Sequence, residues 1–110
     1  MRRLLILVPV VAVSGALAVP ALAATKSVKI GDDYFVRSSG VPTVTVKKND
    51  TVKWNFTGDS PHNVTVKKGP VKFKSKTMES GSYRKKVTRK GLYTIICTIH
   101  DGQSMKLRVK

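Results

Sequence analysis

Residues 92–109 contain two β-strand patterns and the loop that joins them: LYTIIC (92–97), TIHDGQS (98–104) and MKLRV (105–109). The first pattern is mostly apolar and ends at Cys97, whereas the last alternates apolar and basic residues with a period of two. These patterns are typical of a central strand and of a strand with one buried face. A loop of this size can fold three side chains around one point, so we expect Cys97, His100 and Met105 to lie close together.

Further strand patterns continue toward the N-terminus of the chain. In residues 51–56 the period of two places Val52, Trp54 and Phe56 on one face, which predicts a core position for Trp54. Gly, Pro, Asn and Asp collect between the apolar runs, as is typical of turns. Short strands at this spacing predict an antiparallel sandwich or barrel. The other predicted strands cover 27–30, 34–36, 43–46, 62–66 and a charged outer strand at 82–87, and one helical turn is expected within 74–80.

The first 23 residues have the order of a secretory signal peptide. Arg2 and Arg3 precede the apolar stretch 4–18, and Ala21-Leu22-Ala23 supplies a small-residue cleavage site. We predict cleavage after Ala23, with Ala24 as a near alternative, and an uncleaved membrane anchor as the competing interpretation. The chain then divides into a signal peptide, 1–23, and one domain, 24–110, of a protein exported to the periplasm or the cell exterior.

The predicted domain is strongly basic. Removing residues 1–23 takes away two of the 21 Lys and Arg and none of the six Asp and Glu, which leaves a net charge of +13. Such a field favours encounters with anionic partners. We expect an acidic redox protein as partner, with an anionic cell surface as a further possibility. Export and the lack of a recognisable nucleic-acid-binding motif argue against a nucleic acid as the partner.

Four side chains form a candidate metal site: His62, Cys97, His100 and Met105. The two histidines and the cysteine are all that the chain contains, so a disulfide within one chain is impossible. Two imidazoles and a thiolate with a weak axial thioether are the ligands of a blue-copper site. We therefore predict one copper ion bound by these four residues. We expect His62 to be buried and His100, in the loop, to reach solvent with one ring edge.

Other interpretations of the same residues are weaker. Taken singly, a histidine, a methionine or a buried cysteine is most often structural. Zinc competes for the same ligands, but structural zinc sites rarely include a thioether. Cysteine–histidine catalysis would need a third orienting group, and none is evident in the sequence.

The chain resembles the plastocyanin-like cupredoxins, the blue copper proteins, over almost all of 24–110. The resemblance implies an all-β fold, a Greek-key β-sandwich of about eight strands with copper at one end. It also implies a monomeric carrier of single electrons rather than an enzyme. The spacing Cys97-x2-His100-x4-Met105 matches the loop length of plastocyanin. The other segments that carry the resemblance are 44–54, 60–64, 80–83 and 91–97.

Some residues depart from the plastocyanin pattern. Thr98-Ile99 stands where plastocyanins commonly carry a proline, and Ile96 replaces the tyrosine before the cysteine. The acidic patch of plastocyanins is also absent from this basic sequence, so photosynthetic partners are not implied. The alternative functions are copper handling in the secretory compartment and a metal-free adhesion module. The compact four-ligand set favours electron transfer over both.

Overall fold

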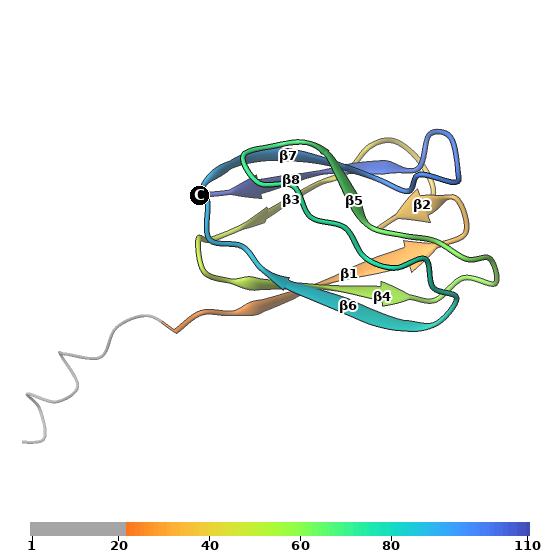
Figure 1. Ribbon diagram of the computed structural model, residues 1–110, viewed down its shortest axis with the longest axis horizontal. Coiled ribbons are helices and arrows are strands. Elements are labelled where there is room, and N and C mark those ends of the chain that lie inside the picture. Colours follow the sequence, from red (N-terminus) through yellow and green to blue (C-terminus); the bar gives the residue numbers. More distant parts are fainter. Residues whose placement is uncertain (1–21) are drawn as a thin grey trace, which may run out of the picture.

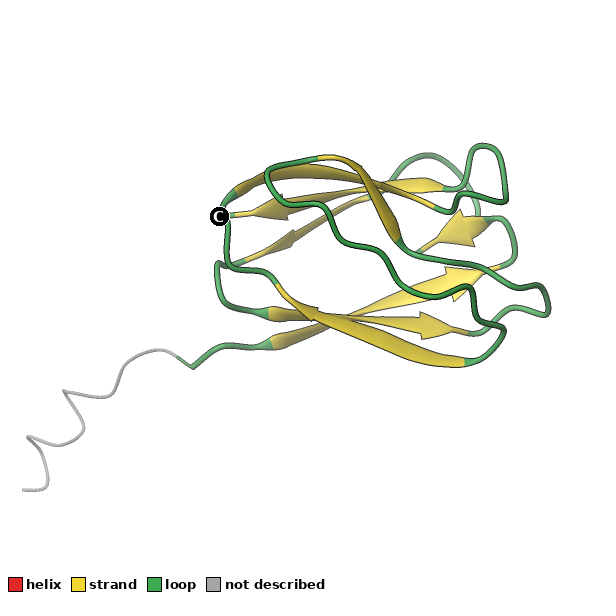
Figure 2. Ribbon diagram, viewed as in Figure 1, coloured by secondary structure: helices red, strands yellow, loops and turns green. Residues whose placement is uncertain are grey.

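The computed structural model describes residues 22–110, which form an all-β sandwich of eight strands (Figures 1 and 2). One sheet has the order β2-β1-β4-β6 and the other the order β3-β8-β7-β5. The strands are β1 (Thr25–Gly31), β2 (Tyr34–Phe35), β3 (Thr43–Val46), β4 (Thr51–Phe56), β5 (Thr65–Lys68), β6 (Gly81–Lys86), β7 (Gly91–Ile96) and β8 (Ser104–Val109). This architecture confirms the predicted fold class.

The strands are not all antiparallel, which corrects the prediction made from the pattern. β1 runs parallel to β4, and β3 runs parallel to β8. Only β1–β2 and β7–β8 are neighbours in both sequence and sheet, because the other connections cross between the two sheets. Alternation of apolar and polar residues gives the buried face of a strand but not the direction of its neighbour.

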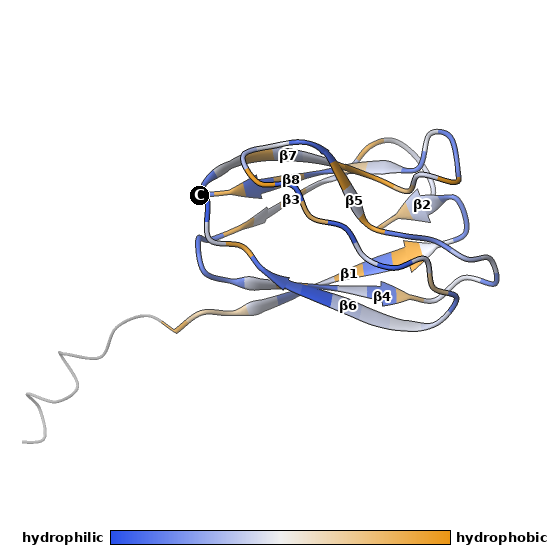
Figure 3. Cartoon of the chain, in the orientation of Figure 1, coloured by the Kyte–Doolittle hydropathy of each residue, from blue (hydrophilic) through white to orange (hydrophobic). Residues whose placement is uncertain are grey.

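Apolar side chains from both sheets fill the space between them. Alternate residues of β4, namely Val52, Trp54 and Phe56, are buried as predicted, and Trp54 is completely inaccessible. Its ring packs against those of Phe73 and Tyr83, with centroids 6.1 and 5.8 Å away. The succession of hydrophobic and hydrophilic residues along the strands is visible in Figure 3.

The charged strand and the apolar strand before Cys97 occupy the sheet positions that the sequence predicts. β6, the charged strand, lies at the edge of its sheet, whereas β7 is central in the other. The antiparallel hairpin of β7 and β8 pairs Ile95 with Met105 and Ile96 with Ser104. It brings the residues that flank the 98–103 loop to one end of the sandwich, at the right in Figure 1.

The helical turn expected within 74–80 does not form. This segment is extended and lies beside 62–66, with isolated bridges between Thr65 and Lys74 and between His62 and Met78. The backbone N–H and C=O groups of Met78 both bond to His62, so cross-strand pairing replaces the bonds that a helix would make. The strand expected from residue 62 begins only at Thr65, and His62 makes an isolated bridge before it. Within 22–110, no helical segment has the length and apolar character needed to cross a bilayer.

Candidate metal centre

The loop between β7 and β8 carries two of the predicted ligands. Cys97 follows the last residue of β7, and its N–H donates to the carbonyl of Gln103, which closes the loop. Gly102 has a φ of +83°, a conformation that favours glycine, and it turns the chain back toward β8. His100 lies between these two points. His62 comes from the other side of the site, before β5, where its backbone pairs with Met78.

The side chains of His62, Cys97 and His100, three of the four predicted ligands, lie close together. The Cys97 Sγ atom lies 3.5 Å from His100 Nδ1 and 3.9 Å from His62 Nδ1. The two imidazole centroids are 4.6 Å apart. One ligand atom from each of the three residues lies within 4.8 Å of the others. One sulfur and two nitrogens therefore surround a point that a single ion can occupy.

The two histidines differ in exposure as expected. His62 is fully buried and Cys97 is 3 % exposed, whereas the His100 side chain is 25 % exposed. Ile99, beside His100, is half exposed. The site is thus closed to water on the His62 side and reaches the surface through the His100 ring.

Asp32 holds the far side of the His62 ring. Its Oδ1 atom lies 3.2 Å from His62 Nε2, and its carboxylate also accepts hydrogen bonds from the backbone N–H groups of Ser60 and Asp59. The donors at Ser60 and Asp59, followed by His62, lower the pKa of Asp32 from 3.8 to about 2. A carboxylate behind a ligating histidine fixes the ring orientation and increases its basicity. A Cβ atom at Gly58 would collide with the Asp32 carboxylate, so the backbone at residue 58 can lie this close to Asp32 only because it is glycine.

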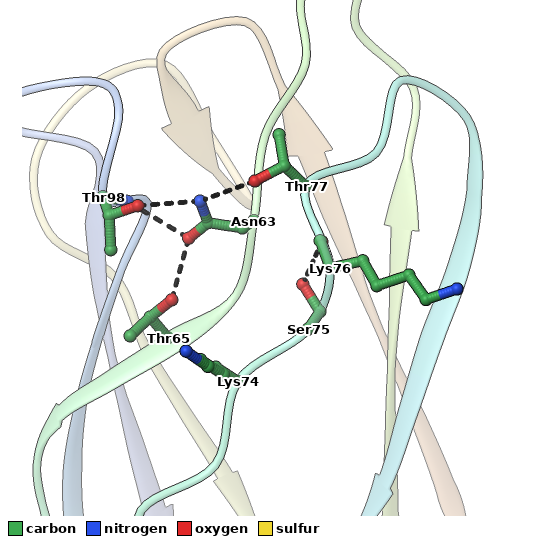
Figure 4. A pocket seen from close by; sticks show the side chains of 7 residues that line it. All are labelled: Asn63, Thr65, Lys74, Ser75, Lys76, Thr77 and Thr98. Carbon is green, nitrogen blue, oxygen red and sulfur yellow. Dashed lines mark hydrogen bonds between the residues drawn. The ribbon is translucent and has the colours of Figure 1, made fainter.

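Asn63 connects the two segments that carry the ligands. Its Oδ1 accepts from the Thr98 N–H at 3.1 Å and from the Thr65 hydroxyl, and its Nδ2 donates to the hydroxyls of Thr98 and Thr77. Figure 4 shows these bonds at the side of a surface pocket of about 520 Å³. The residue after His62 is thereby tied to the residue after Cys97.

The sequence analysis missed Asp32 and Gln103. Gln103 is 1 % exposed, and its Oε1 lies 2.9 Å from His62 Nδ1. Asp32 lies between the predicted strands 27–30 and 34–36, and Gln103 lies in the predicted loop 98–104. No sequence signal marks either residue, because each meets His62 across at least 30 positions of the chain. Met105 is fully buried and pairs with Ile95 in the β7–β8 hairpin. It is two residues after Gln103, which lies just before β8.

The donor chemistry fits copper. Two imidazole nitrogens and a thiolate are the in-plane ligands of blue-copper centres. His62, Cys97 and His100 supply these atoms, and they form the one cluster of three or more His, Cys, Asp and Glu ligand atoms among residues 22–110.

Comparison with known proteins gives the same result. A family model described as copper-binding proteins of the plastocyanin/azurin family matches residues 24–110. Amicyanin from Paracoccus versutus is 31 % identical, with a TM-score of 0.66, over 86 % of this chain and 88 % of that one. A methionine-to-glutamine mutant of amicyanin in the Cu(I) state is 29 % identical, with a TM-score of 0.66, over 78 % and 82 % of the chains.

A copper-containing nitrite reductase from Thermus scotoductus has the same fold in part of its chain. It is 20 % identical with a TM-score of 0.65, and the match covers 84 % of this chain but only 23 % of the reductase. At this identity the likeness concerns the fold alone.

Proposed function

Because the chain belongs to the plastocyanin/azurin family of copper-binding proteins, we propose that it carries single electrons between redox partners by cycling one copper ion between Cu(II) and Cu(I). The observation that carries this proposal is the convergence of Cys97, His62 and His100 around one point. The bound copper supplies the one-electron chemistry. His62, Cys97 and His100 would hold it, and Met105 stays the sequence-based candidate for a further ligand.

The protein around the site limits how far the ligands can move. Asp32 holds the Nε2 atom of the His62 ring, while Asn63 ties the His62 segment to Thr98. Small ligand movement keeps the geometries of the two oxidation states similar, which lowers the barrier to electron transfer. The partly exposed His100 ring, with Ile99 beside it, is the proposed exit for the electron.

We propose electron transfer without an enzymatic reaction. His62 and His100 are the two histidines of the whole sequence, so no second copper site with histidine ligands can be built, as an oxidase would need.

The proposed partner is an acidic redox protein, and an anionic cell surface is a further possible contact. The net charge of +13 after loss of residues 1–23 supports this choice. Three consecutive basic residues, Arg84, Lys85 and Lys86, lie on the edge strand β6.

Export to the periplasm or cell exterior is proposed from residues 1–23. Of these, 1–21 lie outside the described part of the chain. The start of the family match at residue 24 supports the proposed boundary. We propose that the domain acts as a monomer.

Reconstitution with Cu(II) tests the function. Residues 24–110 loaded with one equivalent of Cu(II) should become intensely blue through charge transfer from the Cys97 sulfur. The Cys97→Ser variant should lose this absorption, whereas Ser104→Ala, a change at the first residue of β8, should keep it. A colourless wild-type complex, or an electron paramagnetic resonance (EPR) spectrum of ordinary tetragonal Cu(II), would contradict the proposal. Copper that binds but cannot be reduced and reoxidised reversibly would indicate copper handling instead.

A further inference from the structure

Gln103 places a fixed amide oxygen inside the proposed copper site. Its side chain is 1 % exposed, and its Nε2 donates to the backbone carbonyls of Tyr34 at 2.9 Å and Gly31 at 3.3 Å. Carbonyl oxygens can only accept, so the NH2 group must face them. The amide oxygen therefore faces His62 Nδ1, at 2.9 Å.

This arrangement changes when a metal binds. Without a metal, His62 Nδ1 can carry a proton and donate it to the Gln103 oxygen. Nδ1 is also the His62 atom that lies 3.9 Å from Cys97 Sγ, and it must lose that proton to bind a metal. Two electron-rich atoms would then face each other at hydrogen-bond distance within a buried site, which is unfavourable unless a cation lies between them.

The distance between the two atoms fits coordination to the same ion. The separation of 2.9 Å between Gln103 Oε1 and His62 Nδ1 is short enough for one ion to contact both atoms, with the oxygen as the weaker and more distant ligand. Gln103 is also opposite Cys97 in the β7–β8 hairpin, since the Cys97 N–H bonds to its carbonyl.

We propose that Gln103 Oε1 is a ligand of the copper ion. The inference rests on the proposed function, because it assumes that His62 and Cys97 bind copper. Glutamine oxygen is one of the axial ligands that blue-copper chemistry accepts. As a harder donor than a thioether, it stabilises Cu(II) relative to Cu(I) and lowers the reduction potential. Met105, two residues after Gln103, can add its sulfur or remain core packing without affecting this assignment.

The test removes the oxygen while keeping the volume of the side chain. Copper-loaded wild type, Gln103→Leu and the control Ser104→Ala are compared by EPR, visible absorption and redox titration. Gln103→Leu should stay coloured, since Cys97 remains, but its copper hyperfine coupling should differ from wild type. Its Cu(I) to Cu(II) ratio at a given potential should rise about tenfold, an upward shift of about 59 mV for one electron. Ser104→Ala should match wild type.

A second measurement covers the risk that Gln103→Leu does not fold, since the carbonyls of Gly31 and Tyr34 would lose a donor. A crystal structure of the copper-loaded wild type should have Oε1 in the coordination sphere. The proposal is overturned if Oε1 lies outside it, or if Gln103→Leu has wild-type EPR and potential. A wild-type protein that never becomes blue would instead refute the proposed function.

Discussion

Replacing Asn63 by alanine tests whether one amide holds the two ligand segments together. Four hydrogen bonds of Asn63 are lost, but they do not count equally. The hydroxyls of Thr65, Thr77 and Thr98 all border the surface pocket (Figure 4), so each can regain a bond to water, but the bonds of Thr65 and Thr77 do not join the His62 segment to the Cys97 loop. The two bonds to Thr98, at 2.8 and 3.1 Å, connect the segments and should dominate the effect.

The expected cost follows from those two bonds. Each contributes about 0.5–1.5 kcal/mol, so Asn63→Ala should lower the free energy of unfolding by about 1–3 kcal/mol. For a domain of this size, 1 kcal/mol changes the Tm by about 4–8 °C, which predicts a decrease of roughly 5–20 °C. Because the same amide aligns His62 with Cys97, release of copper to a chelator should also accelerate.

Urea unfolding of the metal-free protein gives the free energy, and circular dichroism on heating gives the Tm. Thr77→Val is the matched control, since it removes only the longer 3.3 Å bond and should cost less than Asn63→Ala. The reasoning is refuted if Asn63→Ala costs under about 0.5 kcal/mol, or if the control costs as much.

The other predictions concern Asp32, Gly58, Tyr93 and the surface charge. The pKa of Asp32 lies at about 2, below its ordinary 3.8. Its ionised carboxylate should therefore stabilise the metal-free protein fully above about pH 4, and this stabilisation should disappear as the pH falls toward 2. In acid unfolding, the free energy of unfolding of Asp32→Asn should lack this loss between about pH 4 and pH 2. Gly58→Ala would press a Cβ atom against the backbone and carboxylate of Asp32, and should destabilise the domain by more than the 0.5 kcal/mol typical of surface changes, as measured by urea unfolding. The Tyr93 hydroxyl donates to the Arg89 carbonyl at 2.8 Å, so Tyr93→Phe should cost about 0.5–1.5 kcal/mol in the same assay, and no loss would mean that water replaces the bond. Stopped-flow electron transfer to an acidic redox protein should slow steeply as salt rises from about 0.01 M, where the screening length is about 30 Å, to about 1 M, where it is about 3 Å; a constant rate would argue against electrostatic steering.

The hairpin and the core faces could be predicted because they depend on local pattern. Alternation buries Val52, Trp54 and Phe56 on one side of β4, and residues 92–96 of the apolar run form most of the central strand β7. Local pattern failed at 74–80, where pairing with the 62–66 segment outweighs any helical preference. It also could not give the parallel pairs β1–β4 and β3–β8, which depend on how the chain crosses between the sheets.

By itself, the sequence determined which atoms are available to bind a metal. A chain with one cysteine and two histidines can offer a site of one thiolate and two imidazoles only through Cys97, His62 and His100, and the loop after Cys97 already holds His100 close to it. The tertiary structure decided what surrounds those atoms. Asp32 and Gln103 meet His62 across 30 and 41 residues of the chain, and such contacts arise only when the two sheets pack together. The physical reason is that side-chain chemistry is carried by each residue, whereas the partners that orient a ligand depend on the path of the whole backbone.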